Sequence, residues 1–219
     1  MEGGACMIVH LGMTGKLSLV NRNEPTAVHD HLRLLLDNGT ELRFNDARRF
    51  GSITVWPPAE AEPLEKAFTA QTGIEPLGKK FTAVRLSELA RSKKQPVKHF
   101  LMDARVVAGL GNIYANEILF AAAVHPLTPV NHITSVQWAL IARATRRILK
   151  EAIQAGGSTI SDFLGTSGNP GYFQVRFNVY QRRDEQCKRC SAVICKTVTA
   201  GRATYFCPAC QQLPEERIL

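Results

Sequence analysis

The sequence predicts an α+β fold in which an antiparallel β domain is followed by a helical domain and then by a small zinc-binding ribbon. Three observations support this prediction. The first sixty residues contain short apolar runs separated by turn signals, the following segment has the apolar spacing of helices, and two Cys-x-x-Cys pairs stand near the end. With 219 residues, the chain suffices for one large domain or two small ones with a buried core.

Short strands are predicted throughout the first domain. They cover residues 7–11, 16–20, 32–37, 40–44 and 52–56. Asn38-Gly39, between two of these runs, is the strongest short hairpin signal. One loop carries Met13 between glycines, and another presents Arg48-Arg49-Phe50 between strands. Two arginines beside an aromatic ring suit phosphates and stacked bases, although a solvated hairpin end is an equal alternative.

Prolines 57, 58 and 63 interrupt the strand pattern, so we expect an interdomain link before the helical part. Gly109 and Gly111 precede a predicted helix over residues 113–123, whose free N-terminal amides would face an anion. The longest predicted helix begins near Thr134-Ser135 and ends at Gly156-Gly157. The predicted boundaries are 1–62 for the β domain, 63–78 for the linker, 79–178 for the helical domain and 179–212 for the ribbon.

Four cysteines near the end predict one structural zinc ion. They are Cys187, Cys190, Cys207 and Cys210. Zn²⁺ in structural sites takes four ligands at tetrahedral corners, and each Cys-x-x-Cys turn supplies two sulfurs. Because four protein ligands leave no open position, the metal would hold the ribbon rather than react. Two disulfides are the alternative, and Cys6 and Cys195 fit neither pair.

The charge of the chain favours a polyanionic partner. The formal net charge is +8 and the isoelectric point is near 9.4, so nucleic acid is the first candidate. The sequence has no run of eighteen apolar residues and no charged leader followed by an apolar stretch. We therefore expect no membrane partner, and thiols in zinc spacing favour a reducing cytoplasm.

Several unrelated stretches resemble the formamidopyrimidine-DNA glycosylase family, the bacterial base-excision enzymes for oxidised purines. These stretches are residues 10–15 (His-Leu-Gly-Met-Thr-Gly), 46–51 (Asp-Ala-Arg-Arg-Phe-Gly), the Lys-rich 92–98, 111–115 (Gly-Asn-Ile-Tyr-Ala), 170–173 (Pro-Gly-Tyr-Phe) and the four-cysteine ribbon. The resemblance covers nearly the whole chain. It implies a β-sandwich domain joined to a helix-two-turn-helix domain that ends in the zinc ribbon. The implied partner is double-stranded DNA with oxidised bases or abasic sites, bound by a monomer.

The resemblance also assigns site residues. Met13, Arg48 and Phe50 resemble the triad that enters the duplex when a damaged nucleotide is extruded. This is chemically reasonable, because an apolar wedge and an arginine with donors for the orphan base offset the lost stacking. The residues that resemble phosphate or DNA contacts are His10, His29, Lys93, Lys98, Asn112, Tyr180 and Arg202. For His29, a structural histidine is the alternative.

Two further assignments follow from the resemblance. Arg202 resembles the ribbon arginine to which the family also assigns proton donation in δ-elimination, and residues 165–171 resemble the loop that closes over the extruded base.

The sequence departs from the family at its start. Family members begin, after Met removal, with Pro-Glu-Leu-Pro-Glu, whose proline amine is the nucleophile, whereas this chain begins Met1-Glu2-Gly3-Gly4. We therefore expect an N-terminally truncated chain without the Schiff-base proline, its adjacent glutamate and the β-elimination lysine. Such a chain would be inactive, although its family is a DNA glycosylase and abasic-site lyase. The alternatives are an endonuclease VIII-like glycosylase for oxidised pyrimidines and a non-catalytic zinc-ribbon protein that binds damaged DNA.

Overall fold

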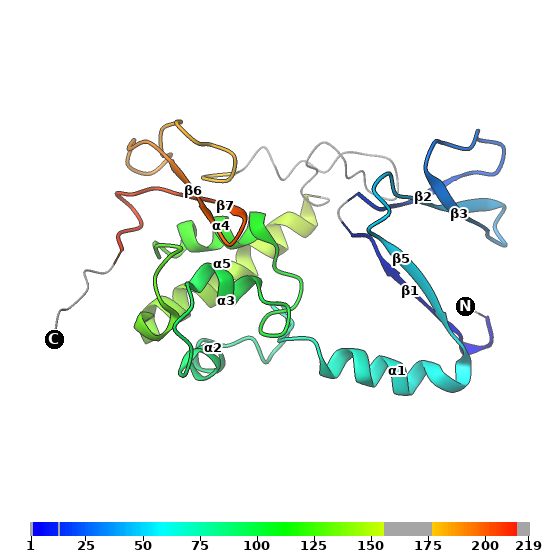
Figure 1. Ribbon diagram of the computed structural model, residues 1–219, viewed down its shortest axis with the longest axis horizontal. Helices are drawn as coiled ribbons and strands as arrows, with labels where there is room; N and C mark the ends of the chain where they lie inside the picture. The colour runs from blue at the N-terminus through cyan, green and yellow to red at the C-terminus, as the bar shows by residue number, and fades with distance from the viewer. Residues whose placement is uncertain (1, 13, 156–176, 214–219) are drawn as a thin grey trace. The chain divides into compact units, whose positions relative to one another are not determined.

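The computed structural model describes residues 2–12, 14–155 and 177–213, and the chain divides into two compact units (Figure 1). The first unit comprises Met1–Thr69 with Ala152–Val175, and the second comprises Ala70–Glu151 with Arg176–Leu219. None of the helices in the described ranges is both long and apolar enough to span a membrane.

Five predicted strands are confirmed in the first unit, after a short 3-10 turn at Glu2–Gly4. They are β1 (Cys6–His10), β2 (Lys16–Asn21), β3 (Asp30–Leu35), β4 (Thr40–Asn45) and β5 (Ser52–Trp56). All pairings are antiparallel, with β1 against β5 in one sheet and the order β2-β4-β3 in the other. The Asn38-Gly39 turn lies between β3 and β4, as predicted, and Gly39 has a φ of 80°.

The interior of this unit contains a polar cluster as well as apolar side chains. Arg43 is 4% exposed and donates to Glu41 and to the carbonyl oxygens of Glu24 and Pro25. Asp30 adds a second carboxylate at 3.6 Å. Because a buried charge is costly unless paired, this cluster fixes the pairing of β3 with β4. Apolar side chains of both sheets line a groove of about 470 Å³, among them Met7, Leu34, Phe44 and Val55.

Two of the three prolines after β5, Pro58 and Pro63, belong to a helix. Helix α1 spans Pro58–Ala70 and continues through Pro63, so the predicted link over 63–78 begins inside it. Pro58 is the first helical residue, where a fixed φ favours the helix and the missing N–H costs nothing. Pro58 therefore marks the start of a helix, although proline in the sequence was interpreted as a break between domains.

The second unit contains the helices and the ribbon. Its elements are α2 (Ala83–Ala90), α3 (Val97–Met102), α4 (Asn112–Ala121), the 3-10 turn η2 (Val130–His132), α5 (Ser135–Gln154), β6 (Cys195–Thr199) and β7 (Arg202–Phe206). The predicted helices over 113–123 and from 134 are α4 and α5; the predicted end of α5 at 156–157 lies outside the described residues.

Local sequence explains where α5 begins and how it is buried. Thr134 and Gln137 form a capping box, in which each side chain accepts the backbone N–H of the other at 3.2 and 2.9 Å. One face of α5 is buried, and its Trp138 packs against Phe100 of α3 with ring centroids 5.6 Å apart. Helices α3 and α5 therefore share one apolar core with α4, whose Ile118 and Leu119 have no exposed surface.

Candidate zinc centre and nucleic-acid interface

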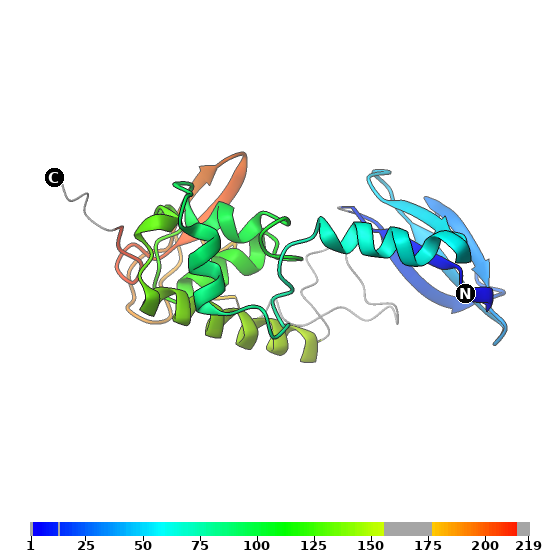
Figure 2. The ribbon, with the colours of Figure 1, turned by 90° about the horizontal axis from the view of Figure 1, so that it is seen from below.

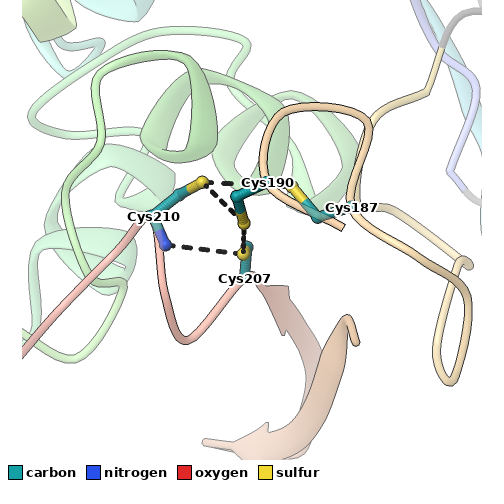
Figure 3. A group of neighbouring side chains, drawn as sticks. All are labelled: Cys187, Cys190, Cys207 and Cys210. Carbon is teal, nitrogen blue, oxygen red and sulfur yellow. Dashed lines mark hydrogen bonds between the residues drawn. The ribbon is translucent and has the colours of Figure 1, made fainter. Parts of the chain in front are cut away.

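The four predicted cysteine ligands form one cluster at the end of the second unit (Figure 3). Their sulfur atoms all lie within 4.8 Å of one another. The separation is 3.9 Å for Cys187 and Cys210, and 3.4 Å for Cys190 with each of Cys207 and Cys210. A tetrahedral Zn²⁺ with bonds of about 2.3 Å sets its sulfurs about 3.8 Å apart. The donor set therefore fits one structural zinc ion, and none of the six cysteines is in a disulfide.

The electrostatics of the cluster also call for a cation. Burial acts against ionisation of Cys187, yet the backbone amides of Arg189 and Cys190 bring the pKa of its thiol down to about 7. Burial and the neighbouring thiols raise the pKa of Cys210 to about 12. Four sulfurs this close do not ionise together without compensation, and a zinc ion supplies it by binding them as thiolates. Amide N–H groups of Arg189 and Cys210 donate to Cys187 and Cys207, both at 3.4 Å, and support those thiolates.

The part of the ribbon that carries the four cysteines packs on helix α4. Cys187 and Cys207 are buried in an apolar cluster with Phe120, Val179, Ile194 and Tyr205. The neighbouring Arg189 donates to the carbonyl oxygen of Phe120 at 2.8 Å, and its guanidinium lies 4.2 Å from the Phe120 ring centroid. A cation at the carboxyl end of a helix meets the unpaired carbonyls and the negative end of the helix dipole. Arg189 therefore holds the ribbon on α4.

Two polar residues of α4 make further contacts to the ribbon. Glu117 is 2% exposed, and its carboxylate accepts the backbone N–H groups of Asn178, Val179 and Tyr180 at 2.9 to 3.0 Å. Asn116, with no exposed surface, accepts the N–H of Tyr205 at 2.8 Å. We did not predict either residue, although an Asn-Glu pair inside an apolar helix was a signal for buried polar contacts.

Among the expected DNA contacts of this unit, Asn112 and Tyr180 lie at the junction of α4 and the ribbon. Asn112 is the first residue of α4, and its carbonyl oxygen accepts the side-chain amide of Asn116 at 2.6 Å. The Tyr180 ring packs edge-on against Tyr205, with centroids 5.2 Å apart. Lys93 is half-buried just before α3, with its ammonium 5.5 Å from the centroid of the Phe100 ring.

Lys98, which was expected to contact DNA, is buried inside the second unit. It is 1% exposed, and its ammonium donates to the carbonyl oxygen of Ala203 at 2.8 Å and the hydroxyl of Thr204 at 2.7 Å. Burial, and secondarily the charge of Arg202, lower the pKa of Lys98 to about 8. The reason for the difference is that the hairpin of β6 and β7 covers this part of α3. Arg202 itself is exposed at the start of β7.

In the first unit, two loops with predicted site residues lock together around Asp46. The Asp46 carboxylate has no exposed surface and accepts the Thr14 hydroxyl at 2.5 Å and the Gly51 amide at 2.7 Å. The Thr14 hydroxyl hydrogen bond, followed by the Gly51 amide, lowers the pKa of Asp46. Gly12 is required, because a β-carbon there would lie 2.7 Å from the carbonyl carbon of Phe50.

Arg48 and Phe50 project from this locked pair of loops. Phe50 is 55% exposed, and the guanidinium carbon of Arg48 lies 4.7 Å from its ring centroid. His10 is exposed at the end of β1 and accepts the Gly12 amide at 3.2 Å through Nδ1. His29 is exposed with a φ of 74°, and its carbonyl oxygen accepts the Asp46 amide at 3.1 Å. Met13 and residues 165–171 lie outside the described ranges.

Comparisons with known proteins agree with this architecture. The formamidopyrimidine-DNA glycosylase N-terminal domain matches residues 1–53, the H2TH domain of the same enzyme matches 72–164, and the zinc finger found in FPG and IleRS matches 184–213. The formamidopyrimidine-DNA glycosylase of Syntrophotalea carbinolica is 42% identical over 208 residues, which are 94% of this chain and 75% of that relative. The chain belongs to the formamidopyrimidine-DNA glycosylase family.

Other members support the assignment. The formamidopyrimidine-DNA glycosylase of Geotalea uraniireducens is 45% identical over 205 residues, 94% of this chain and 74% of the relative. The Lactococcus lactis Fpg in complex with abasic-site DNA matches with a TM-score of 0.86 at 34% identity, over 95% of this chain and 75% of that one. MutM (FPG) of Thermus thermophilus matches with a TM-score of 0.84 at 37% identity, over 97% of this chain and 77% of that one. The predicted combination of sheet domain, helix-two-turn-helix domain and four-cysteine zinc ribbon is thereby confirmed.

Proposed function

We propose that this member of the formamidopyrimidine-DNA glycosylase family recognises oxidised purines and abasic sites in double-stranded DNA during base-excision repair. The observation that carries the proposal is the exposed Arg48–Phe50 pair on a rigid base. An aromatic ring and a guanidinium that face solvent together suit insertion into a duplex at the place that an extruded nucleotide leaves. The buried Asp46 limits their movement, so little conformational entropy is lost on insertion.

The second unit supplies the contacts that we propose for the phosphate backbone. Arg202 is exposed on the ribbon hairpin, and Asn112 begins α4, where the amide N–H groups of the first helical turn favour an anion. Tyr180 and Lys93 of this unit, and His10 of the first unit, complete the proposed set. For Arg202 we also propose the proton-donor role in δ-elimination. A protein that repairs DNA and keeps its zinc thiolates reduced suits the cytoplasm.

Structures of relatives support the choice of lesion. Complexes of Lactococcus lactis Fpg with abasic-site DNA and, for a mutant, with Fapy-dG DNA have the same fold as this chain. A further complex of the wild-type Lactococcus lactis protein contains an oxidized pyrimidine. Oxidised pyrimidines are therefore the second candidate lesion for this chain.

We propose separately that the 219 residues as printed bind lesions without excising them. The family mechanism needs a secondary amine that attacks the sugar and remains attached as an iminium. Met1-Glu2-Gly3-Gly4 does not provide a proline at this place. A polypeptide of these 219 residues alone is therefore expected to bind lesions without the covalent step.

The test is binding of duplexes that differ in a single nucleotide. Fluorescence anisotropy would compare 8-oxoguanine, thymine glycol, a tetrahydrofuran abasic-site analogue and an undamaged control at a fixed salt concentration. We expect the abasic analogue and 8-oxoguanine to bind more tightly than the undamaged duplex. Equal affinity for all four would contradict the proposed function, and preference for thymine glycol would favour oxidised pyrimidines.

A further inference from the structure

Lys98 is a buried cation whose hydrogen-bond partners are neutral. Its ammonium contacts the Ala203 carbonyl and the Thr204 hydroxyl, and no ion pair to Lys98 is found among the described residues. An ammonium inside a protein is costly unless its hydrogen bonds are well made. The charge that acts on its pKa is that of Arg202, which has the same sign. A methionine would fill the same space with apolar contacts alone, so the buried charge of Lys98 needs a specific explanation.

The hydrogen bonds of Lys98 end at the base of a tight turn. Strands β6 and β7 are joined by Ala200 and Gly201, both with positive φ, at 48° and 71°. A two-residue turn of this kind fixes the register of the strands that it joins. Thr204 has no exposed surface, and its hydroxyl oxygen lies 3.1 Å from that of Thr199 on the facing strand. The ammonium therefore holds a threonine pair that spans the hairpin.

Arg202 is the first residue after this turn. It pairs with Thr199 across the hairpin and immediately precedes Ala203, whose carbonyl Lys98 binds. In both views of the structure, the hairpin of β6 and β7 lies beside α4, and β7 contacts that helix (Figures 1 and 2). A contact from α3 to the backbone next to Arg202 restrains the Arg202 Cα and leaves its guanidinium in solvent.

We propose that Lys98 is a positioning residue for Arg202: by binding Ala203 and Thr204 from beneath, it fixes the hairpin turn from which Arg202 reaches a DNA phosphate. The inference rests on the proposed function only for the last step, the phosphate contact. Lys98 makes no contact with DNA itself, because its side chain is 1% exposed.

The test is a double-mutant cycle between Lys98→Met and Arg202→Gln, read as duplex affinity over a range of salt concentrations. Loss of one phosphate contact is expected to weaken binding about tenfold and to lower the salt slope by about 0.9. If Lys98 acts through Arg202, Lys98→Met has a similar effect alone and no further effect in the Arg202→Gln background. If the two losses of affinity multiply in the double variant and its salt slope falls by about 1.8, the proposal is overturned and Lys98 is an independent phosphate contact.

A second pair of variants separates positioning from general destabilisation. Thr204→Val removes the hydroxyl that Lys98 binds and keeps the shape, whereas Thr204→Ser keeps the hydroxyl. We expect Thr204→Val to weaken duplex binding in the same direction as Lys98→Met, and Thr204→Ser to bind as the unsubstituted chain does. Equal weakening by both threonine variants would overturn the proposal. Lys66→Met, at a side chain that is 75% exposed, is the control for loss of a lysine charge.

A measurement without DNA keeps the inference separate from the proposed function. Amide hydrogen exchange of residues 199–204 should become at least about tenfold faster in Lys98→Met and Thr204→Val, while zinc content is unchanged. Unchanged exchange in Lys98→Met would overturn the inference even if DNA binding is lost. Faster exchange in a chain that binds no duplex would support the positioning of the turn and contradict the proposed function alone.

Discussion

The carboxylate of Glu117 accepts the backbone N–H of Tyr180 at 2.9 Å, although the two residues are 63 positions apart. The same carboxylate accepts the amides of Asn178 and Val179 and the side-chain amide of Asn178. Hydrogen bonds to a charged acceptor are stronger than neutral ones, and these are shielded from water. Glu117 therefore sets the path by which the chain enters the zinc ribbon and where the Tyr180 ring stands.

Replacement of Glu117 by glutamine is expected to destabilise the second unit strongly. Glutamine keeps the size of the side chain but turns an NH₂ group toward amides that donate hydrogen bonds. We expect the free energy of unfolding to fall by about 3 kcal/mol, measured by urea denaturation. Glu88→Gln is the control, because Glu88 is 49% exposed and its ion pair with Arg85 lies on the surface. A loss no larger than the control's, which should stay below about 1 kcal/mol, would show that the buried carboxylate is dispensable.

Zinc content distinguishes the four ligands from the other cysteines. We expect one zinc per chain by elemental analysis, and loss of that zinc with unfolding of the ribbon in Cys187→Ser. The reason is that the binding free energy of such a site, about 10–16 kcal/mol, is largely folding free energy. Cys195→Ser is the matched control and should retain its zinc, since Cys195 lies outside the cluster. Stoichiometric zinc in the Cys187→Ser protein would rule out the assigned ligand set.

Stability is expected to fall on acidification because of His125. This ring is 8% exposed, packs 4.5 Å from the Phe206 ring centroid, and accepts the Leu127 amide at 3.2 Å through Nδ1. Burial lowers the pKa of His125. The unfolded chain then binds the proton more readily, so stability is complete above the ordinary histidine pKa, about 6.5, and decreases as pH falls below it. His125→Gln should reduce the pH dependence of the unfolding free energy between about pH 7.5 and 5 relative to the unsubstituted chain. The same substitution of the exposed His132 should leave that pH dependence unchanged.

Substitution of the inserted and the phosphate-binding residues should have different effects on DNA binding. Phe50→Ala is expected to remove most of the preference for abasic over intact duplex, because a wedge is useful only where the helix opens easily. Arg202→Gln should weaken binding to every duplex about tenfold, since phosphate contacts are independent of sequence. Leu35→Ala removes an equally exposed apolar side chain, 58% exposed, and should change neither quantity. Equal losses on intact and abasic duplex for Phe50→Ala would refute its assignment.

Local patterns in the sequence were sufficient for most elements. Short apolar runs between turn signals and the Asn38-Gly39 signal predicted the strands, and the cysteine spacing predicted a cluster that the structure forms. These features depend on neighbours in the chain, so they are visible without tertiary information. Asp46 shows the limit: its motif was recognised, but its partner Thr14 is 32 residues away.

The roles of single charges could not be predicted, because each depends on what covers it. Lys98 was expected to contact DNA, yet it binds a backbone carbonyl of the protein, as does Arg189 beside the zinc ligands. Arg146 on α5 likewise donates to the carbonyl oxygen of Phe81 at 2.6 Å. Composition identifies a basic surface, whereas the share of it that is free for a polyanion depends on tertiary packing.

The last prediction concerns covalent chemistry by the chain as printed. We expect no borohydride-trapped product when residues 1–219 are incubated with duplex containing 8-oxoguanine or an abasic site, even where binding is measurable. The iminium that borohydride reduces forms only from an unprotonated amine that reaches the sugar. Arg202 is a guanidinium and a poor nucleophile, and Lys98, with a pKa lowered to about 8, is enclosed under the hairpin. The Geotalea uraniireducens relative serves as the positive control under the same conditions. A trapped adduct from residues 1–219 would disprove the expectation.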